Sequence, residues 1–213
     1  MRKGYPIIYL YLPFQYWRQE GKTYQQNFKP NKHHKIHEKL LVDLLKRLEF
    51  STVLEVGCGF GRITKLMLNN FKGIKEYDAI DLSPDQIENA KRYVNSPLVK
   101  YQVSEIQAFN PNGKKYDLVL ISEVLLHIMP SEIKAVMEKL ISLSNKHVVN
   151  IDYYEDVQTL NLEEYNFLHQ YEQIYKSIPN VKRVERIHVR ENKLFGRSDF
   201  KELQSIFHAE IAP

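Results

Sequence analysis

Three glycines, Gly57, Gly59 and Gly61, have the spacing in this chain that most directly predicts chemistry. An apolar strand is predicted before them, over residues 52–56, and an amphipathic helix after them. Glycine allows a sharp turn, and it lets a ligand approach the peptide groups at a helix start closely. Asp81 follows about twenty residues after Gly61, at the end of a second apolar run. A carboxylate there can accept hydrogen bonds from ribose hydroxyls, so we expect a nucleoside-like cofactor.

The residues after Asp81 show where its strand ends. Ser83, Pro84 and Gln86 are typical of a helix start, with an N-cap, a proline in the first turn and a capping-box glutamine. The strand predicted over residues 76–81 therefore ends at Asp81, and ligands of open parallel sheets bind beyond such ends. Because strands and helices alternate, we expect a parallel sheet with helices on both faces. Further strands are predicted at 99–103, 118–121 and 147–151, and helices at 36–48 and after Pro130.

The last third of the chain predicts a helix around Leu160 to Ser177. Two strand-like runs follow, Val184 to Val189 and Leu194 to Gly196, joined by a polar turn. This region is rich in basic residues, which could attract an anionic substrate. A solvated edge strand is the more common explanation for such charges.

The G-x-G-x-G spacing, with Glu55 in the strand and Arg62 beside the last glycine, resembles motif I of the class I S-adenosylmethionine (SAM) dependent methyltransferases. The similarity extends over residues 36–155. It implies SAM as the cofactor and S-adenosylhomocysteine (SAH) as its product. It also implies an α/β fold, a Rossmann-like, doubly wound, mostly parallel seven-stranded sheet with an antiparallel C-terminal strand.

Three later segments carry the same resemblance. Asp81 matches the acid that holds the ribose in this family, and Val103-Ser104-Glu105-Ile106 stands where the family reads the adenine, usually with an aspartate in place of Glu105. Residues 116–128 resemble the fourth strand and the loop after it. The cofactor-binding residues implied in this way are Glu55, Gly57, Cys58, Gly59, Gly61, Asp81, Leu82, Glu105, Ile106 and Ser122.

Individual roles follow from the resemblance. The backbone of residues 57–61 would meet the methionine part of SAM, Leu82 would pack on the adenine, and Ser122 with Glu123 would face the methionyl amine or the methyl group. Glu55 would order the glycine loop, a hypothesis favoured over a plain surface charge because a carboxylate within an apolar strand usually has a partner. Cys58 is interpreted as a packing residue and not as a nucleophile.

The acceptor side is predicted from residues at strand ends. His127 follows the fourth strand and could serve as a general base, or could simply pack at a helix start. Asp152 and Tyr153 follow the fifth strand, and we name them with His127 as catalytic candidates. The aromatic segment 1–35 is predicted to form a lid over the domain at 36–213, with a packing arm as the alternative.

Composition narrows the class of protein. The 213 residues suit one domain, with 43% hydrophobic and 26% charged residues, and a net charge of +4 is too small to indicate a nucleic-acid partner. One cysteine excludes an internal disulfide, and we expect a cytoplasmic protein with no membrane span. His33, His34 and His37 are interpreted as a solvated basic helix start, and no metal is expected.

The loop after the fourth strand bears on the substrate. It reads Ser122-Glu123-Val124-Leu125, whereas family members that methylate the bases of nucleic acids often have Asn/Asp-Pro-Pro-Tyr/Phe there. The resemblance therefore favours a small-molecule acceptor methylated on O or N, by a monomer or homodimer. A protein lysine methyltransferase is the first alternative. A SAM-binding partner subunit without catalysis is the second.

Overall fold

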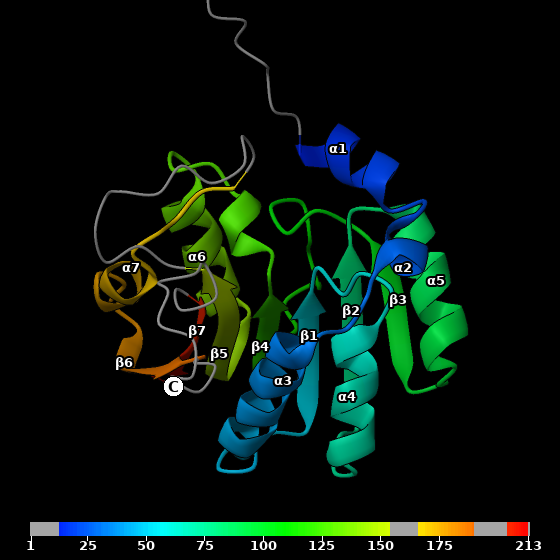
Figure 1. Ribbon diagram of the computed structural model, residues 1–213. Coiled ribbons are helices and arrows are strands. Elements are labelled where there is room, and N and C mark those ends of the chain that lie inside the picture. Colours follow the sequence, from blue (N-terminus) through cyan, green and yellow to red (C-terminus); the bar gives the residue numbers. More distant parts are fainter. Residues whose placement is uncertain (1–12, 154–165, 190–203, 213) are drawn as a thin grey trace, which may run out of the picture.

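The computed structural model describes residues 13–153, 166–189 and 204–212. Seven strands form one sheet in the order β3-β2-β1-β4-β5-β7-β6 (Figure 1). Neighbouring strands from β3 to β5 run parallel, and β7 is antiparallel to both β5 and β6. The predicted fold class is thereby confirmed. The strands are β1 Thr52–Val56, β2 Glu76–Asp81, β3 Val99–Val103, β4 Tyr116–Ser122, β5 Ser144–Tyr153, β6 Val181–His188 and β7 Gln204–Ile211.

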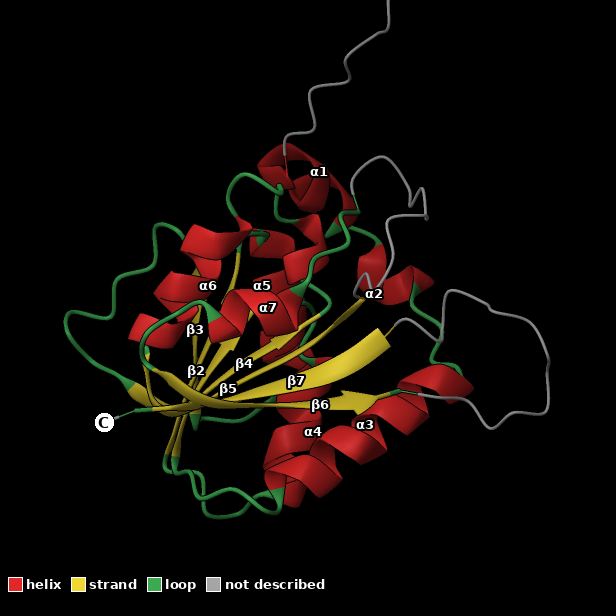
Figure 2. Cartoon of the chain, turned by 90° about the vertical axis from the view of Figure 1, so that its left-hand side faces the viewer, coloured by secondary structure: helices red, strands yellow, loops and turns green. Residues whose placement is uncertain are grey.

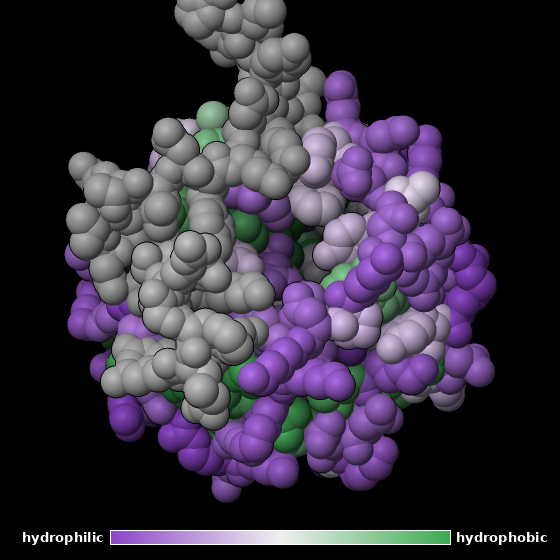
Figure 3. Space-filling view, viewed as in Figure 1, coloured by the Kyte–Doolittle hydropathy of each residue, from purple (hydrophilic) through white to green (hydrophobic). Residues whose placement is uncertain are grey.

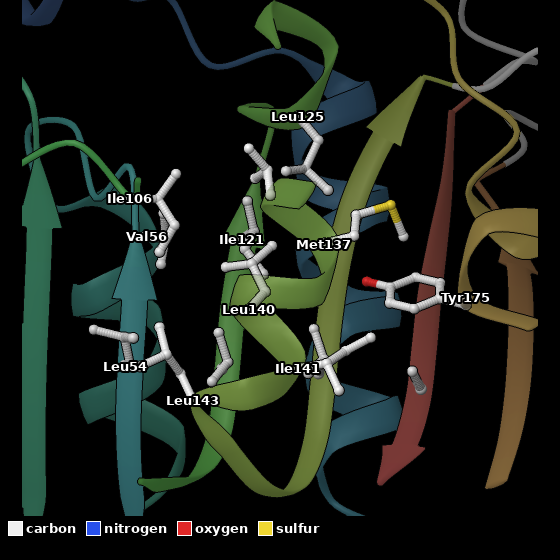
Figure 4. Close-up of a cluster of buried hydrophobic side chains, with 14 of the residues drawn as sticks. Leu54, Val56, Ile106, Ile121, Leu125, Met137, Leu140, Ile141, Leu143 and Tyr175 are labelled. Atoms are coloured by element: carbon white, nitrogen blue, oxygen red, sulfur yellow. The ribbon is translucent and has the colours of Figure 1, made fainter. Parts of the chain in front are cut away.

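Helices cover both faces of the sheet (Figures 1 and 2). One apolar cluster joins the sheet to α3, α4 and α5, and a second joins the other face to α6 and α7. Leu54, Val56, Ile121 and Tyr175 belong to the second cluster, which Figure 4 shows. The helices are α1 Pro13–Glu20, α2 Tyr24–Asn27, α3 Lys32–Leu45, α4 Arg62–Asn70, α5 Pro84–Val94, α6 Ile133–Ser142 and α7 Tyr171–Lys176, with a 3-10 turn, η1, at Leu125–His127.

The predicted helix start after Asp81 is present. The Ser83 hydroxyl accepts a hydrogen bond from the backbone N–H of Gln86, and Pro84 occupies the first turn of α5. This cap ends β2 at Asp81, and the parallel pairing brings the ends of β1, β2, β3 and β4 to the same edge of the sheet. Loops after these strands therefore meet at one place, which is where the site is built.

The aromatic N-terminal segment lies over this edge. In Figure 1, α1 and α2 lie beyond the carboxyl ends of the strands, as a lid would. Gly21 connects them, and a Cβ there would lie 2.1 Å from the Ser83 hydroxyl, so the segment packs directly on the start of α5. α3 begins at Lys32, and the boundary predicted between residues 35 and 36 thus falls inside a helix.

The C-terminal part differs from the prediction. Residues 166–170 are not helical and α7 begins at Tyr171, whereas residues 160–165 of the expected helix lie outside the described residues. The run expected at Val184 to Val189 is β6, but its antiparallel partner is β7, which the sequence did not indicate. The run at 194–196 and its turn lie outside the described residues. Within the described ranges, no helix has the length and apolar character needed to cross a bilayer.

Candidate active site

The glycine loop joins β1 to α4 with three residues in the left-handed region. Gly57, Gly59 and Gly61 have φ values of +70°, +54° and +90°. A Cβ at Gly57 would lie 2.2 Å from Val124 Cγ2, so the loop passes close to the segment after β4. A Cβ at Gly59 would meet only the Gln86 amide, at 3.8 Å. The space beside the Gly59 Cα is therefore open, which leaves room for a ligand close to the backbone of the loop.

Asp81 holds this loop from the neighbouring strand. Its Oδ2 accepts a hydrogen bond from the N–H of Gly59 at 2.9 Å, and its Oδ1 accepts one from the N–H of Ser83 at 2.8 Å. Burial raises the pKa of Asp81, against the effect of these two donors. Each carboxylate oxygen can accept a second hydrogen bond, so Asp81 can orient the loop and still bind two hydroxyl groups.

Glu55 is buried beneath the loop. Its Oε2 accepts hydrogen bonds from the Thr64 hydroxyl at 2.6 Å and from the Tyr77 hydroxyl at 2.7 Å, which ties β1 to α4 and β2. Burial raises the pKa of Glu55 to about 7, although both hydroxyls lower it. Burial also raises the pKa of the Cys58 thiol, and this disfavours the thiolate that a nucleophile needs.

These groups line a cavity of about 470 Å³ at the edge of the sheet, in the size range of ligand sites. Figure 3 shows a hollow near the middle of this face. Of the ten predicted cofactor residues, nine lie on its wall, including Leu82, Glu105 and Ile106, and Gly61 does not. Ser122 Oγ and Gln86 Oε1 are buried there and have no hydrogen-bond partner among the described residues. Such atoms favour a polar ligand.

Aromatic side chains form the outer wall. Trp17 of α1 lies against His127 of η1, with ring centroids 4.5 Å apart, and Tyr24 of α2 lines the same cavity. Burial raises the pKa of Tyr24, as does the nearby Glu123 carboxylate. α1 and the loop after β4 thus meet through Trp17 and His127 on the cavity wall.

Asp152 and Tyr153 do not line this cavity. Asp152 is fully buried, and its carboxylate accepts hydrogen bonds from the backbone N–H groups of Leu125 and Leu126 at 3.4 and 3.2 Å. Burial raises its pKa well above the ordinary value. The geometry gives Asp152 a part in holding η1, and a catalytic role for either residue stays a prediction.

The expectation of a solvated histidine cluster was wrong. His33 and His37 have 4% and 0% of their surface exposed, because α3 turns both toward β7 and Gln204 lies between them. Among the described residues, no group of three or more His, Cys, Asp or Glu is placed to hold a metal ion. Sequence reasoning also missed several lining residues, since they come from loops and helix starts: Phe60, Arg62, Gln86 and Glu132.

Comparison with known proteins agrees with this site. Residues 53–147 match the family model of a methyltransferase domain. This segment, a little under half of the chain, resembles a methyltransferase domain, in agreement with the family that the glycine motif predicted. The predicted cofactor, SAM, agrees with this family. The residues that bind SAM and catalyse transfer stay predictions.

Two groups of curated relatives resemble the domain. Malonyl-[acyl-carrier protein] O-methyltransferase 1 of Ilyobacter polytropus is 34% identical over 100 residues, which cover 46% of this chain and 36% of that protein. N-terminal Xaa-Pro-Lys N-methyltransferase 1 of Rattus norvegicus is 28% identical over 126 residues, covering 53% of this chain and 55% of that protein. The chain spans about a third of the length of the malonyl-[acyl-carrier protein] O-methyltransferases that it matches first.

Solved structures share the fold. The N-methyltransferase NodS of Bradyrhizobium japonicum WM9, in complex with SAH, gives a TM-score of 0.71 at 16% identity, over 94% of this chain and 98% of that chain. Magnesium protoporphyrin IX methyltransferase of Synechocystis PCC 6803 gives 0.68 at 16% identity, over the same shares of the two chains. At this identity the likeness establishes the fold alone.

Proposed function

We propose that the protein transfers the methyl group of SAM to a nitrogen or oxygen atom of a small-molecule acceptor, with nitrogen favoured. The observation that carries the proposal is the cavity itself. Its lining contains the glycine loop, Asp81 and Glu105, and also the rings of Trp17 and His127, whose centroids lie 4.5 Å apart. A donor and an acceptor can therefore be held in the same cavity.

When bound, SAM supplies a methyl group already activated by a sulfonium. The chain therefore needs mainly to align the two reactants and to exclude water. The peptide groups of residues 57–61 bind the methionine part, Asp81 accepts hydrogen bonds from the ribose hydroxyls, and Glu105 with the Ile106 N–H contacts the adenine. His127 takes a proton from an acceptor that arrives protonated.

Charge favours a nitrogen acceptor. Among the described residues that line the cavity, the carboxylates are Glu55, Asp81, Glu105, Glu123 and Glu132, and the guanidinium of Arg62 already lies 2.6 Å from Glu38 and 3.6 Å from Glu123. Asp81 and Glu105 contact SAM in this proposal, and Glu132, with Trp17 and Tyr24, would attract an amine, because both carboxylates and aromatic faces attract cations. A free carboxylate would be repelled.

A protein amine is the second candidate. The same carboxylates would suit it, and the N-terminal Xaa-Pro-Lys N-methyltransferase 1 of Rattus norvegicus matches this chain over about half of both proteins. The position of Trp17 and the α1 lid favours the small molecule, because a peptide would need the aromatic wall to open.

The test is transfer of a labelled methyl group from SAM to a panel of small amines, alcohols, carboxylates and short peptides. We expect SAH formation with amines, and a loss in His127→Asn that is larger in kcat than in SAH affinity. Transfer to carboxylates alone would refute the nitrogen preference, and transfer to peptides alone would favour the second candidate. SAH binding with no transfer to any acceptor would instead indicate the non-catalytic partner subunit.

A further inference from the structure

A ring of polar side chains, buried at His33, His37 and Gln204 and half-buried at Arg62 and Glu123, connects four separate elements. Glu123, at the end of β4, accepts a hydrogen bond from Gln204 Nε2 at 2.9 Å. Gln204 Oε1, at the start of β7, lies 2.6 Å from His33 Nε2 and 3.3 Å from His37 Nδ1. His37 Nε2 lies 3.0 Å from Arg62 Nη1, and Arg62 Nη2 lies 3.6 Å from Glu123 Oε2. The ring therefore closes on the two cavity residues Arg62 and Glu123.

The ring has one consistent set of proton positions. Glu123 can only accept, so the amide nitrogen of Gln204 faces it and the amide oxygen faces α3. That oxygen accepts from His33 Nε2–H and His37 Nδ1–H. His37 Nε2 then has a lone pair for the Arg62 N–H, which a charged imidazole would lack. Burial lowers the pKa of His37 to about 4, so the neutral form is present at physiological pH.

The fold alone does not account for this arrangement. Gln204 is completely buried, and His33 Nδ1 is buried without a hydrogen-bond partner among the described residues. Apolar side chains of similar volume commonly fill such a place with equal or better stability. Glu123 also has a φ of +57°, a backbone conformation that a residue with a side chain rarely adopts. Residues in such strained conformations are often found at functional sites.

We propose that Gln204 is a positioning residue for the methyltransferase site. Gln204 holds the Glu123 carboxylate in place on the cavity wall and, through His37, also the Arg62 guanidinium. A role of Gln204 in methyl transfer rests on the proposed function, whereas a role in ligand binding rests only on the cavity. Gln204 does not line the cavity, so it acts only through Glu123 and Arg62. A fixed pair of opposite charges can orient a polar ligand without first reorganising.

The charges around Glu123 fit such a role. Burial raises the pKa of its carboxyl, but the Arg62 guanidinium and the Gln204 amide, together with His37 and His34 when they are protonated, lower the pKa overall. Glu123 therefore stays ionised in the absence of ligand. The other titratable side chains that sense it are Tyr24, Asp152 and Tyr153.

The first experiment is a double-mutant cycle on SAH binding, measured by calorimetry on the full chain. Gln204→Met keeps the length of the side chain and removes the donor, and we expect SAH to bind about tenfold more weakly. In a Glu123→Ala background, the same substitution should change the dissociation constant less than about twofold, because the partner is already gone. Additive effects, or no effect of Gln204→Met, would overturn the proposal.

Tyr116→Phe is the matched control. Tyr116 is fully buried at the amino-terminal start of β4, away from the cavity, and its hydroxyl donates a hydrogen bond to Asp78 Oδ2 at 2.6 Å. Losing that hydrogen bond should lower the melting temperature and leave SAH affinity unchanged. If Tyr116→Phe weakens SAH binding as much as Gln204→Met does, the effect of Gln204 is general destabilisation and the positioning role is refuted.

Gln204→Glu provides a readout that a merely structural residue would not move. The new carboxylate would lie next to Glu123, in the place of the amide nitrogen that donates a hydrogen bond to Glu123 in wild type. Two adjacent carboxylates ionise together only with difficulty. Relative to wild type at each pH, SAH binding should be weakest near pH 8 and recover as the pH falls to 5.5, when one proton is shared. A constant ratio would contradict the proposal. SAH binding tests the ring independently of methyl transfer, so a failure of the proposed reaction leaves these outcomes readable.

Discussion

Glu55 gives the sharpest prediction about the stability of the site. Glu55→Gln replaces a buried carboxyl, 3% exposed, by an amide of the same shape that cannot ionise. Thr64 and Tyr77 both donate to one oxygen, Oε2, and the amide oxygen of glutamine can accept both hydrogen bonds. The substitution therefore removes the titration of this group and little else.

The magnitude follows from the pKa of Glu55. Burial raises it to about 7 in the folded protein, from an ordinary value of 4.5. Because the folded pKa is the higher one, the stability linked to this group is fully present below pH 4.5 and is lost as the pH rises through 7. Wild type should thus lose about 3 kcal/mol of unfolding free energy relative to Glu55→Gln between pH 4.5 and 8.

The assay is urea unfolding followed by circular dichroism, without cofactor, at several pH values from 4.5 to 8. The informative quantity is the increase with pH of the difference in unfolding free energy between Glu55→Gln and wild type. A difference that is the same at every pH does not affect the test. Glu88→Gln is the control, because Glu88 is exposed on α5 and hydrogen bonding to Lys91 lowers its pKa. Curves for Glu55→Gln and wild type that stay parallel would refute the reasoning.

Other substitutions probe the loop, the ribose site and the lid. Gly57→Ala brings a Cβ to 2.2 Å from Val124 at a φ of +70°, and should destabilise the fold by at least about 1 kcal/mol, whereas Gly73→Ala has nothing within 4 Å; equal melting temperatures would contradict this. Asp81→Ala should weaken SAH binding by about tenfold or more in calorimetry, and unchanged affinity would remove its ribose role. Trp17→Ala should lower kcat/KM for the acceptor by about tenfold with a smaller change in SAH affinity, and full activity would exclude a lid.

Local signals explain why much of the sheet could be predicted. The strands at 52–56, 76–81 and 99–103 match the structure, since glycine, proline and capping residues mark the ends of the first two. β7 was missed for the opposite reason. It is buried almost throughout, yet it contains Gln204, Ser205 and His208, so its sequence lacks the apolar run that indicates a central strand.

The site divides in the same way. The glycine loop, Asp81 and Ser122 could be predicted, because short segments at strand ends both build the turn and contact the cavity. Residues such as His33 and Gln204 could not, since their hydrogen bond joins positions 171 residues apart and each looks like an ordinary polar residue in its own segment. The histidines were expected in solvent for that reason, whereas Gln204 makes their burial possible.

Asp81 and Asp152 show why a carboxylate at a strand end is weak support for catalysis. Each accepts two backbone N–H groups, Asp81 from the glycine loop and the start of α5, and Asp152 from the two residues before His127. Burial raises the pKa of each carboxyl, and the backbone hydrogen bonds lower it. Both residues hold a loop that lines the cavity, but only Asp81 itself lines the cavity. An aspartate at the carboxyl end of a strand thus holds the following loop in both places. Whether it can also contact a ligand depends on the side of the loop on which the cavity lies.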